Sequence, residues 1–595
     1  MVVRHINLRQ NQREVAMSPG RRNFLAIIAG AAVVGGSVYF VGLRDLTLTF
    51  PDGLPQLSDQ SVPLPIASAV TKQRWLDAAK IAFADADIRT SSGKRIEITV
   101  QNVLSGESML GIASQALQPV VWSPGEMTWA DQLNERWNRN NPTPVMTNTC
   151  DPTVLTPVGL AMWRPMAEAL GWPADPISWA ELIALANDPQ GWASYGHPEW
   201  GRLRLGHTHP QYSSAGLLFL ASVIYAISGK TEAIKPDDIY AEQVESGLAA
   251  LAQNTAKYGM VTTDLLNNMA SFGPSFLHVT SAFEEGTVRF NIERKDDLRW
   301  PLAFVFPEEG TFWSDQPYCI LDGAAWVSDE QAEAAQLFLA FLKSDAIQAE
   351  AGNHFIRPLN AATPIGSLLT LDNGTSPAAS RDSVPDFEIP SPEVSESIID
   401  QFLNTKRKAT VVLVVDTSGS MQQDNRIGTA TTATAAFLRR LDPRDRVGLV
   451  TFSNRVHQIA PIAPVKEIGE ATTQRVLSLV ANGGTNLHGA VCEATRLIAE
   501  EQAQDRAQSD NRLYGIVLLS DGDDTENEVS ETRMFQTCLG TRAEGNDGPK
   551  MFVISFGGDT DVNLLKRLAQ ETNGVLFTAD PASIDATYLK ISAEQ

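Results

Sequence analysis

Short apolar runs alternate with amphipathic stretches along most of this 595-residue chain, a pattern typical of α/β domains. In the first half, helical spacing predicts a buried face made of Trp75, Leu76, Ala79, Ala82 and Phe83. Alternation then predicts a strand through Ile96, Ile98 and Val100. A second helix is predicted from Glu330 to about Ala351, with a buried stripe of Leu337, Phe338, Phe341 and Leu342.

The second half contains continuous apolar runs, which are typical of strands covered on both faces of a parallel sheet. These runs are Val411–Val415, Val447–Phe452 and Ile516–Leu519. Helical patterns follow two of the loops and are marked by Phe437, Leu438 and Leu441, and then by Leu487, Val491, Ala494 and Ile498. This alternation predicts a doubly wound, Rossmann-like domain over residues 406–595.

A change in amino-acid composition marks the boundary between the two predicted domains. Residues 361–392 are rich in Ser, Thr, Pro and Asp and carry an Asn373-Gly374 turn signal. We therefore expect a linker over 361–405 between one domain at 61–360 and another at 406–595. Residues 44–60 are polar, contain Pro and Asp, and are expected to form a spacer.

The N-terminus predicts a membrane anchor. Residues 1–23 are rich in Arg, and residues 24–43 form an apolar stretch long enough to span a bilayer as a helix. The Arg excess predicts a cytoplasmic N-terminus, with the bulk of the chain outside. A cleaved signal peptide is the alternative, and Arg21-Arg22 also resembles a twin-arginine export signal. No Cys stands there to carry a lipid.

Charge and cysteine content narrow the function. The net charge of −23 and the pI near 4.8 argue against nucleic acid as a partner and suit an extracytoplasmic surface. The four cysteines show no CxxC spacing, so no zinc or thioredoxin-like site is indicated. No Ser-His-Asp, Cys-His or Walker-type arrangement appears in the C-terminal half, so we expect a binding protein and not an enzyme.

Oxygen-bearing side chains follow the apolar strands of the second half. Because ligands of such sheets lie beyond the carboxyl ends of the strands, three loops are expected to converge there. Their candidate metal ligands are Asp416, Ser418, Ser420, Thr485 and Asp521. This hard-oxygen set suits Mg²⁺, or Mn²⁺ or Ca²⁺, and suits zinc or copper poorly.

This DxSxS pattern with a distant Thr and Asp resembles the metal-ion-dependent adhesion site of von Willebrand factor A and integrin I domains. The resemblance implies direct coordination by Ser418, Ser420 and Thr485, with Asp416 and Asp521 acting through water. It also implies a partner protein that supplies an acidic residue to the metal. Asp523, Asp524 and Glu526 have two interpretations, an outer acidic shell or a solvated loop.

Residues 61–360 resemble the two-lobed extracellular solute-binding proteins of bacteria, which have a periplasmic-binding fold. The segments on which this resemblance rests include 65–68, 121–124, 156–170, 177–182, 206–210 and 357–358. The resemblance makes Ser105, Gly106, Glu107, Ser123, Ser213 and Ser214 candidates for lining a ligand cleft, with Thr280 and Ser281 weaker candidates. Helix capping is the alternative for such serines.

Three further groups have open interpretations. His207 and His209 suit either a polar hinge rim or an incomplete metal site, and Trp122 and Trp129 suit packing or a ligand platform. The solute-binding resemblance places Cys150 and Cys319 on hinge-crossing strands, near enough for a disulfide. Cys492 and Cys538 lie on predicted helices of the C-terminal domain, where a second disulfide is possible.

We therefore expect a membrane-anchored extracytoplasmic protein with a two-lobed domain and a metal domain. The metal domain would dock a partner protein, and the two-lobed domain would bind a small solute or a second partner. The alternative is an anchored solute-binding component of an ABC-type transport system, in which the metal domain recruits the permease.

Overall fold

The computed structural model describes residues 61–139, 141–148, 150–540, 549–557, 562–580, 583–584, 587–588 and 591. The expected basic segment 1–23, the apolar segment 24–43 and the spacer 44–60 lie outside these residues. In the part of the chain that is described, no helix is long and apolar enough to span a membrane.

The first lobe is built on a sheet in the order β10-β3-β1-β2, in which β1 pairs in parallel with β2 and β3. The predicted helical face is present, since Trp75, Leu76 and Phe83 are buried. The elements of this lobe are β1 (Ser61–Ser68), α2 (Gln73–Asp85), β2 (Arg95–Asn102), α3 (Ser105–Ala113), β3 (Val121–Ser123), α4 (Thr128–Asn138), β10 (Cys319–Ile320), α12 (Asp329–Leu342) and α13 (Asp345–Glu350).

The single helix expected over 330–351 is wrong in its continuity. Helix α12 ends at Leu342, and extended backbone at Ser344 (φ −66°, ψ 146°) precedes α13. Phe338 and Leu342 are buried as expected, whereas Leu337 and Phe341 are only partly buried. The apolar stripe could not reveal this break because it ends where the break occurs.

The second lobe holds a mixed sheet in the order β11-β4-β7-β5-β6, with β8 and β9 also paired to β4. Its elements are β4 (Val154–Trp163), α5 (Arg164–Ala169), α6 (Trp179–Asn187), β5 (Leu205–Thr208), α7 (Ser214–Ser228), α8 (Pro236–Ile239), α9 (Glu242–Asn254), β6 (Thr255–Gly259), α10 (Thr262–Phe272), β7 (Val279–Phe283), α11 (Glu284–Glu293), β8 (Leu302–Val305), β9 (Trp313–Ser314) and β11 (Arg357–Pro358).

A disulfide joins two segments that cross between the lobes. Cys150 lies before β4 and Cys319 lies in β10, with their Cα atoms 4.3 Å apart. The neighbouring residues Asp151 and Tyr318 exchange backbone hydrogen bonds of 3.1 and 2.8 Å. The solute-binding resemblance implied this pairing, and the structure contains it. The crossing strands are therefore tied together covalently.

The segment expected as a linker contains a helix, α14 (Pro392–Thr405), which begins at a Ser391 cap. Its buried side chains Val394, Ile398 and Phe402 are spaced by four residues and join the main core of the two-lobed domain. Upstream, Phe387 stacks on Tyr225 with a ring separation of 5.0 Å. Residues 361–405 thus pack as part of the two-lobed domain.

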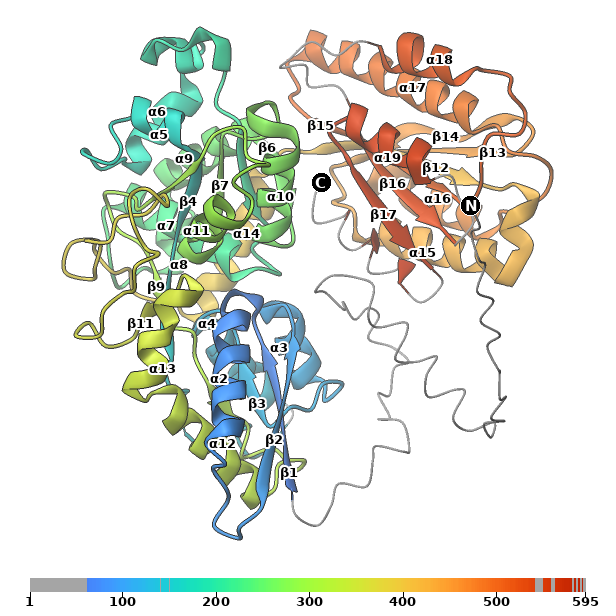
Figure 1. Ribbon diagram of the computed structural model, residues 1–595. Coiled ribbons are helices and arrows are strands. Elements are labelled where there is room, and N and C mark those ends of the chain that lie inside the picture. Colours follow the sequence, from blue (N-terminus) through green and yellow to red (C-terminus); the bar gives the residue numbers. More distant parts are fainter. Residues whose placement is uncertain are drawn as a thin grey trace, which may run out of the picture. The chain divides into compact units, whose positions relative to one another are not determined.

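The C-terminal domain contains a sheet in the order β14-β13-β12-β15-β16-β17, parallel except for the edge strand β14. Helix α17 covers one face and helices α15 and α16 cover the other (Figure 1). The elements are β12 (Ala409–Asp416), α15 (Arg426–Arg440), β13 (Arg446–Phe452), β14 (Val456–Pro464), α16 (Val465–Leu477), α17 (Leu487–Gln508), β15 (Leu513–Ser520), α18 (Glu531–Arg533), β16 (Lys550–Phe556), α19 (Val562–Glu571) and β17 (Val575–Ala579).

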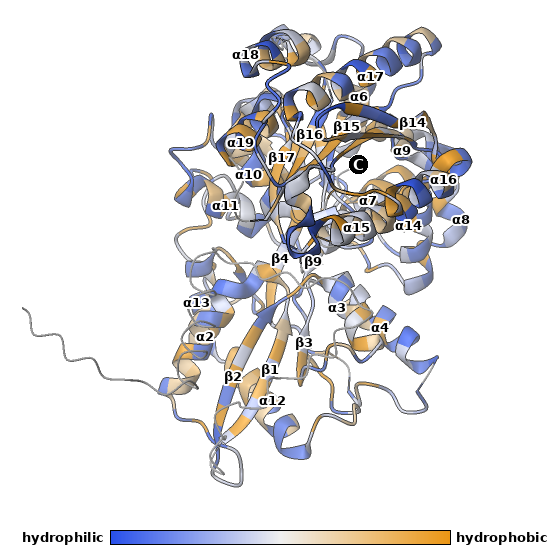
Figure 2. Cartoon of the chain, turned by 90° about the vertical axis from the view of Figure 1, so that its right-hand side faces the viewer, coloured by the Kyte–Doolittle hydropathy of each residue, from blue (hydrophilic) through white to orange (hydrophobic). Residues whose placement is uncertain are grey.

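Alternate residues of β12 enter separate cores on the two faces of this sheet. Val411 and Leu413 pack with Phe437 of α15, whereas Val412 and Val414 pack in the core of α17. The strands are coloured mainly as hydrophobic and the covering helices carry both kinds of residue (Figure 2). Burial on both faces explains the continuous apolar runs and fixes the loops at the carboxyl edge of the sheet.

Candidate metal centre and ligand cleft

Three loops meet at the carboxyl edge of the C-terminal sheet. Asp416 is the last residue of β12, and Asp521 directly follows β15, which is the neighbouring parallel strand. The third loop, residues 482–485, precedes α17 and is joined to the first by two backbone bonds. Gly419 N donates to Gly483 O at 2.9 Å, and Asn482 N donates to Thr417 O at 2.8 Å.

Hydrogen bonds connect four of the five candidate metal ligands to one another. The Ser418 and Ser420 hydroxyls lie 3.0 Å apart, and the Ser420 hydroxyl donates to Asp521 Oδ1 at 2.7 Å. Asp416 Oδ1 accepts the Ser418 amide at 2.8 Å, and its Oδ2 accepts the Ser520 hydroxyl at 2.6 Å. These groups therefore form one polar cluster, to which the loop after β12 contributes Asp416, Ser418 and Ser420 and the loop after β15 contributes Asp521.

Thr485 is held at the edge of this cluster by the loop that follows β15. Its backbone N–H donates to Thr525 Oγ1 at 2.8 Å, and Thr525 N donates to Thr485 O at 2.8 Å. Gly483 has φ +81°, and an added Cβ would lie 2.0 Å from Asn454 Oδ1. Glycine is thus required for the turn that brings Thr485 to the site.

Burial makes the cluster a strong electrostatic site. Asp416, Ser418 and Asp521 are 0%, 1% and 3% exposed. Desolvation raises the pKa of the Asp416 carboxyl to about 6, against the lowering effect of its bonds from Ser418 and Ser520. Above that pH the buried carboxylate is charged and attracts a cation.

The donor set fits a hard divalent cation. It consists of hydroxyl and carboxylate oxygens, which are the ligands that Mg²⁺, Mn²⁺ and Ca²⁺ prefer. Among the described residues no group of three or more His, Cys, Asp or Glu side chains could hold a metal. A soft or carboxylate-rich metal site is therefore not found in that part of the chain, and the hydroxyl-rich cluster is the candidate.

The acidic loop after Asp521 serves mainly to shape the site. Asp524 accepts the His488 amide at 3.0 Å at the start of α17, and Glu526 Oε1 accepts the Asn454 amide group at 2.9 Å. Asp523 and Glu526 are exposed.

The sequence analysis missed two residues that contact the candidate metal ligands. The Ser520 hydroxyl donates to Asp416, and Arg426 Nη1 lies 2.9 Å from Asp521 Oδ2.

In the two-lobed domain, the candidate cleft residues come together across the lobes. Ser105 begins α3 of the first lobe and Ser214 begins α7 of the second, and their hydroxyls lie 3.4 Å apart. Ser105 Oγ also accepts the Gly125 amide at 3.0 Å, and Ser214 Oγ accepts the Trp129 indole N–H at 2.8 Å. The lobes are therefore closed at this point, and Trp129 is part of the contact.

The other candidates have different surroundings. Ser123 Oγ donates to Pro317 O at 2.5 Å, and Ser213 Oγ accepts the Thr208 hydroxyl at 2.9 Å. An added Cβ on Gly106 would lie 2.6 Å from Gln211 O, so the lobes are in contact there as well. Glu107 lies half-buried in the first turn of α3. The weaker candidates Thr280 and Ser281 are buried within β7, and Trp122 is buried in the first lobe.

Two buried charged residues beside this contact were missed from the sequence. Lys72 Nζ donates to Ser123 O and Pro124 O at 3.0 Å and to Gln316 Oε1 at 2.8 Å, and burial lowers its pKa to about 7. Burial raises the pKa of Glu126 to about 8. No local sequence pattern identifies either residue, because their burial depends on how segments distant in the sequence pack around them.

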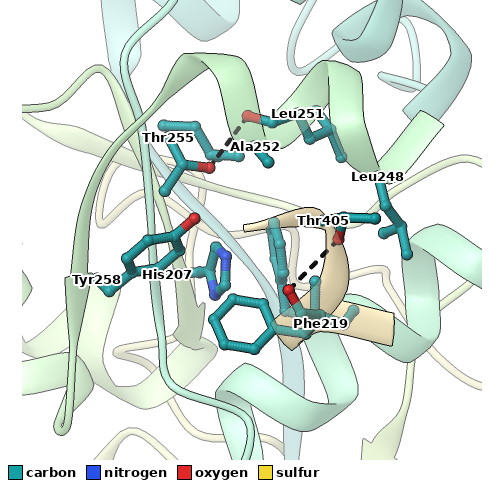
Figure 3. Close-up of a pocket in the computed structure, with 11 residues that line it drawn as sticks. His207, Phe219, Leu248, Leu251, Ala252, Thr255, Tyr258 and Thr405 are labelled. Carbon is teal, nitrogen blue, oxygen red and sulfur yellow. Dashed lines mark hydrogen bonds between the residues drawn. The ribbon is translucent and has the colours of Figure 1, made fainter. Parts of the chain in front are cut away.

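His207 and His209 belong to an aromatic cluster and not to a metal site. His207 stacks on Phe219 at 4.8 Å, its Nδ1 lies 2.9 Å from Thr208 O, and His209 lies edge-on to Phe402 at 5.0 Å. Burial lowers their pKa values to about 4 and about 3, so both rings are neutral at pH 7. Phe402 and Thr405 of α14 help to line a small, largely apolar pocket. Figure 3 shows His207, Tyr258 and Thr405 around this pocket.

Comparisons with known proteins agree with both halves of the fold. Residues 411–523 match the family model of the von Willebrand factor type A domain, and residues 64–355 match that of the bacterial extracellular solute-binding protein. The inter-alpha-trypsin inhibitor heavy chain H4 of Sus scrofa is 29% identical over 166 residues, which are 28% of this chain and 17% of that protein. The uncharacterized protein MT1884 of Mycobacterium tuberculosis (strain CDC 1551 / Oshkosh) is 22% identical over 433 residues, covering 71% of this chain and 60% of that protein.

Two solved structures are similar to parts of this chain. A periplasmic thiamin binding protein is 16% identical with a TM-score of 0.41, covering 59% of this chain and 99% of its own. A von Willebrand factor type A protein from Catenulispora acidiphila is 20% identical with a TM-score of 0.27, covering 32% of this chain and 42% of its own.

Proposed function

Because this chain joins a bacterial extracellular solute-binding domain to a von Willebrand factor type A domain, we propose that it is an extracytoplasmic docking protein whose partner binds through a divalent metal. Both domains are of binding types, and the proposal is of a binding protein and not an enzyme. The chain spans only 17% of the heavy chain H4 and 60% of MT1884, so the proposal rests on this chain's own residues.

The observation that carries the proposal is the buried oxygen cluster at the sheet edge. Ser418, Ser420 and Thr485 would coordinate Mg²⁺, or Mn²⁺ or Ca²⁺, directly, while Asp416 and Asp521 would act through water. The ion would supply positive charge at the surface, where a carboxylate from a partner protein can complete its oxygen shell. The chain's own residues orient that shell and exclude bulk water from its inner side.

The two-lobed domain is proposed to bind a small solute or a second partner. The contact between Ser105 and Ser214 makes lobe opening and closing the step that would admit a solute. The match over residues 64–355 favours a second candidate function, in which the domain delivers a solute to an ABC-type permease that the metal domain recruits.

Export and anchoring complete the proposal. The Cys150–Cys319 and Cys492–Cys538 disulfides suit an oxidising compartment outside the cytoplasm. The apolar segment 24–43 would anchor the chain in the membrane after the Arg-rich segment 1–23. A new N-terminus beyond Leu43 in the mature protein, found by mass spectrometry, would contradict the anchor.

Cross-linking in native membranes tests metal-dependent docking. The wild-type chain should cross-link to one partner in Mg²⁺, lose it in EDTA and regain it when Mg²⁺ is restored, whereas Thr485→Ala should cross-link weakly throughout. A partner held equally well in EDTA would contradict docking through the metal. All 12 Trp residues lie between Trp75 and Trp326, so their fluorescence in a solute panel separately tests ligand binding by the two-lobed domain.

A further inference from the structure

Arg426 is in direct contact with the proposed metal centre, although it cannot be a metal ligand. It is the first residue of α15, and its side chain is 10% exposed. Its Nη1 donates to Asp521 Oδ2 at 2.9 Å, while Asp521 Oδ1 accepts the Ser420 hydroxyl at 2.7 Å. One carboxylate therefore links the arginine to the hydroxyl cluster.

The backbone conformation before α15 positions the Arg426 guanidinium beside Asp521. Asp424 and Asn425 both have left-handed backbone conformations, with φ +48° and +56°, and they turn the chain from the Ser420 loop into α15. Gly557 faces the guanidinium, since an added Cβ there would lie 2.9 Å from Arg426 Cζ. The left-handed turn at Asp424 and Asn425 and the lack of a side chain at Gly557 together leave space for the buried guanidinium.

We infer that Arg426 is a positioning residue that lowers the negative charge of the metal centre so that the bound ion retains a net positive charge for an anionic partner. The inference rests on the proposed metal site. Asp416 and Asp521 contribute two negative charges, and Arg426 adds one positive charge. A divalent ion then leaves the site with one net positive charge, which an incoming carboxylate neutralises.

Removing the arginine should therefore change two affinities in opposite directions. Without Arg426, two carboxylates face the ion and balance it fully, so the ion binds more tightly. The same change leaves no net positive charge, so a carboxylate ligand binds less tightly. A residue that merely supported the fold would weaken both, because a distorted site loses its geometry for ion and ligand alike.

The test uses the full chain with Mn²⁺ as the ion and acetate as the carboxylate probe. Calorimetry measures Mn²⁺ affinity, and the water-proton relaxation rate of the loaded protein follows acetate as it displaces metal-bound water. Arg426→Gln should bind Mn²⁺ about tenfold more tightly and acetate about tenfold more weakly than wild type. Arg426→Lys, which keeps the charge, should remain near wild type in both, and Arg440→Gln removes an exposed charge at the far end of α15 as a matched control.

The outcomes separate this inference from the proposed function. Absence of Mn²⁺ binding by the wild-type chain would overturn both. Wild-type binding together with unchanged or weaker Mn²⁺ binding by Arg426→Gln would overturn the role of Arg426 alone. If Arg426→Gln folds only when Mn²⁺ is present, the ion is replacing the arginine charge and the inference is supported. Failure to fold with and without Mn²⁺ would show a packing role and overturn it.

Discussion

Replacing Phe402 by Ala should destabilise the two-lobed domain strongly, because α14 is part of its core. Phe402 is 3% exposed, and its ring lies 5.7 Å from His207, 5.0 Å from His209 and 5.4 Å from Tyr258. Truncation of a buried Phe to Ala costs about 3–5 kcal/mol. Since the ring borders an existing pocket, the neighbours cannot refill the space fully, and we expect about 4 kcal/mol.

Tryptophan fluorescence during urea unfolding measures this loss without a contribution from the metal domain, since all 12 Trp residues precede residue 361. The exposed neighbour Asn404 provides the control, and Asn404→Ala should change the free energy of unfolding by no more than about 0.5 kcal/mol. Equal, small effects of the two substitutions would show that α14 does not pack on the domain in solution. Residues 361–405 would then be the linker that their composition indicates.

Further outcomes follow from the same structure. Ser418→Ala should weaken Mg²⁺ binding about 10–100-fold in calorimetry while leaving the metal-free melting temperature nearly unchanged, and an affinity within threefold of wild type would refute its role as a ligand. The folded pKa values of His207 and His209, about 4 and about 3, lie below the unfolded value of about 6.5, so stability is fully present above that value and is lost as pH falls toward 4. Each should remove about 2 kcal/mol by pH 5, and His207→Gln should flatten the pH dependence of the tryptophan-detected transition. Replacing Cys492 and Cys538 by Ser should cost the metal domain about 2–4 kcal/mol in thermal scans by circular dichroism, and an unchanged transition would contradict a structural disulfide.

Much of the fold was predictable because buried parallel strands have a distinctive pattern. The runs at Val411–Val415 and Ile516–Leu519 are buried on both faces, and their carboxyl ends must share one edge. That rule places Asp416, Asp521 and the loop that contains Thr485 at one edge, whereas the division into direct and water-mediated ligands was implied by a family resemblance. The other contacts within the site depend on the conformations of the loops, which the strand pattern does not predict.

Other features depended on information that local patterns do not carry. Arg426 reaches Asp521 only through the left-handed turn at Asp424 and Asn425, and no spacing rule predicts that turn. Helix α14 was hidden by its polar, Pro-containing surroundings, although Val394 and Ile398 have helical spacing. The contact between Ser105 and Ser214 depends on how two lobes close, which is set by long-range packing.

Anomalous scattering from crystals of the full chain grown with Mn²⁺ would show directly whether the oxygen cluster binds a divalent metal. We expect one strong anomalous peak within coordination distance, about 2.2 Å, of the Ser418, Ser420 and Thr485 hydroxyl oxygens. The peak should disappear after a soak in EDTA. No peak at this position in Mn²⁺-saturated crystals, or a Mn²⁺ ion held only elsewhere on the chain, would contradict the proposed metal site.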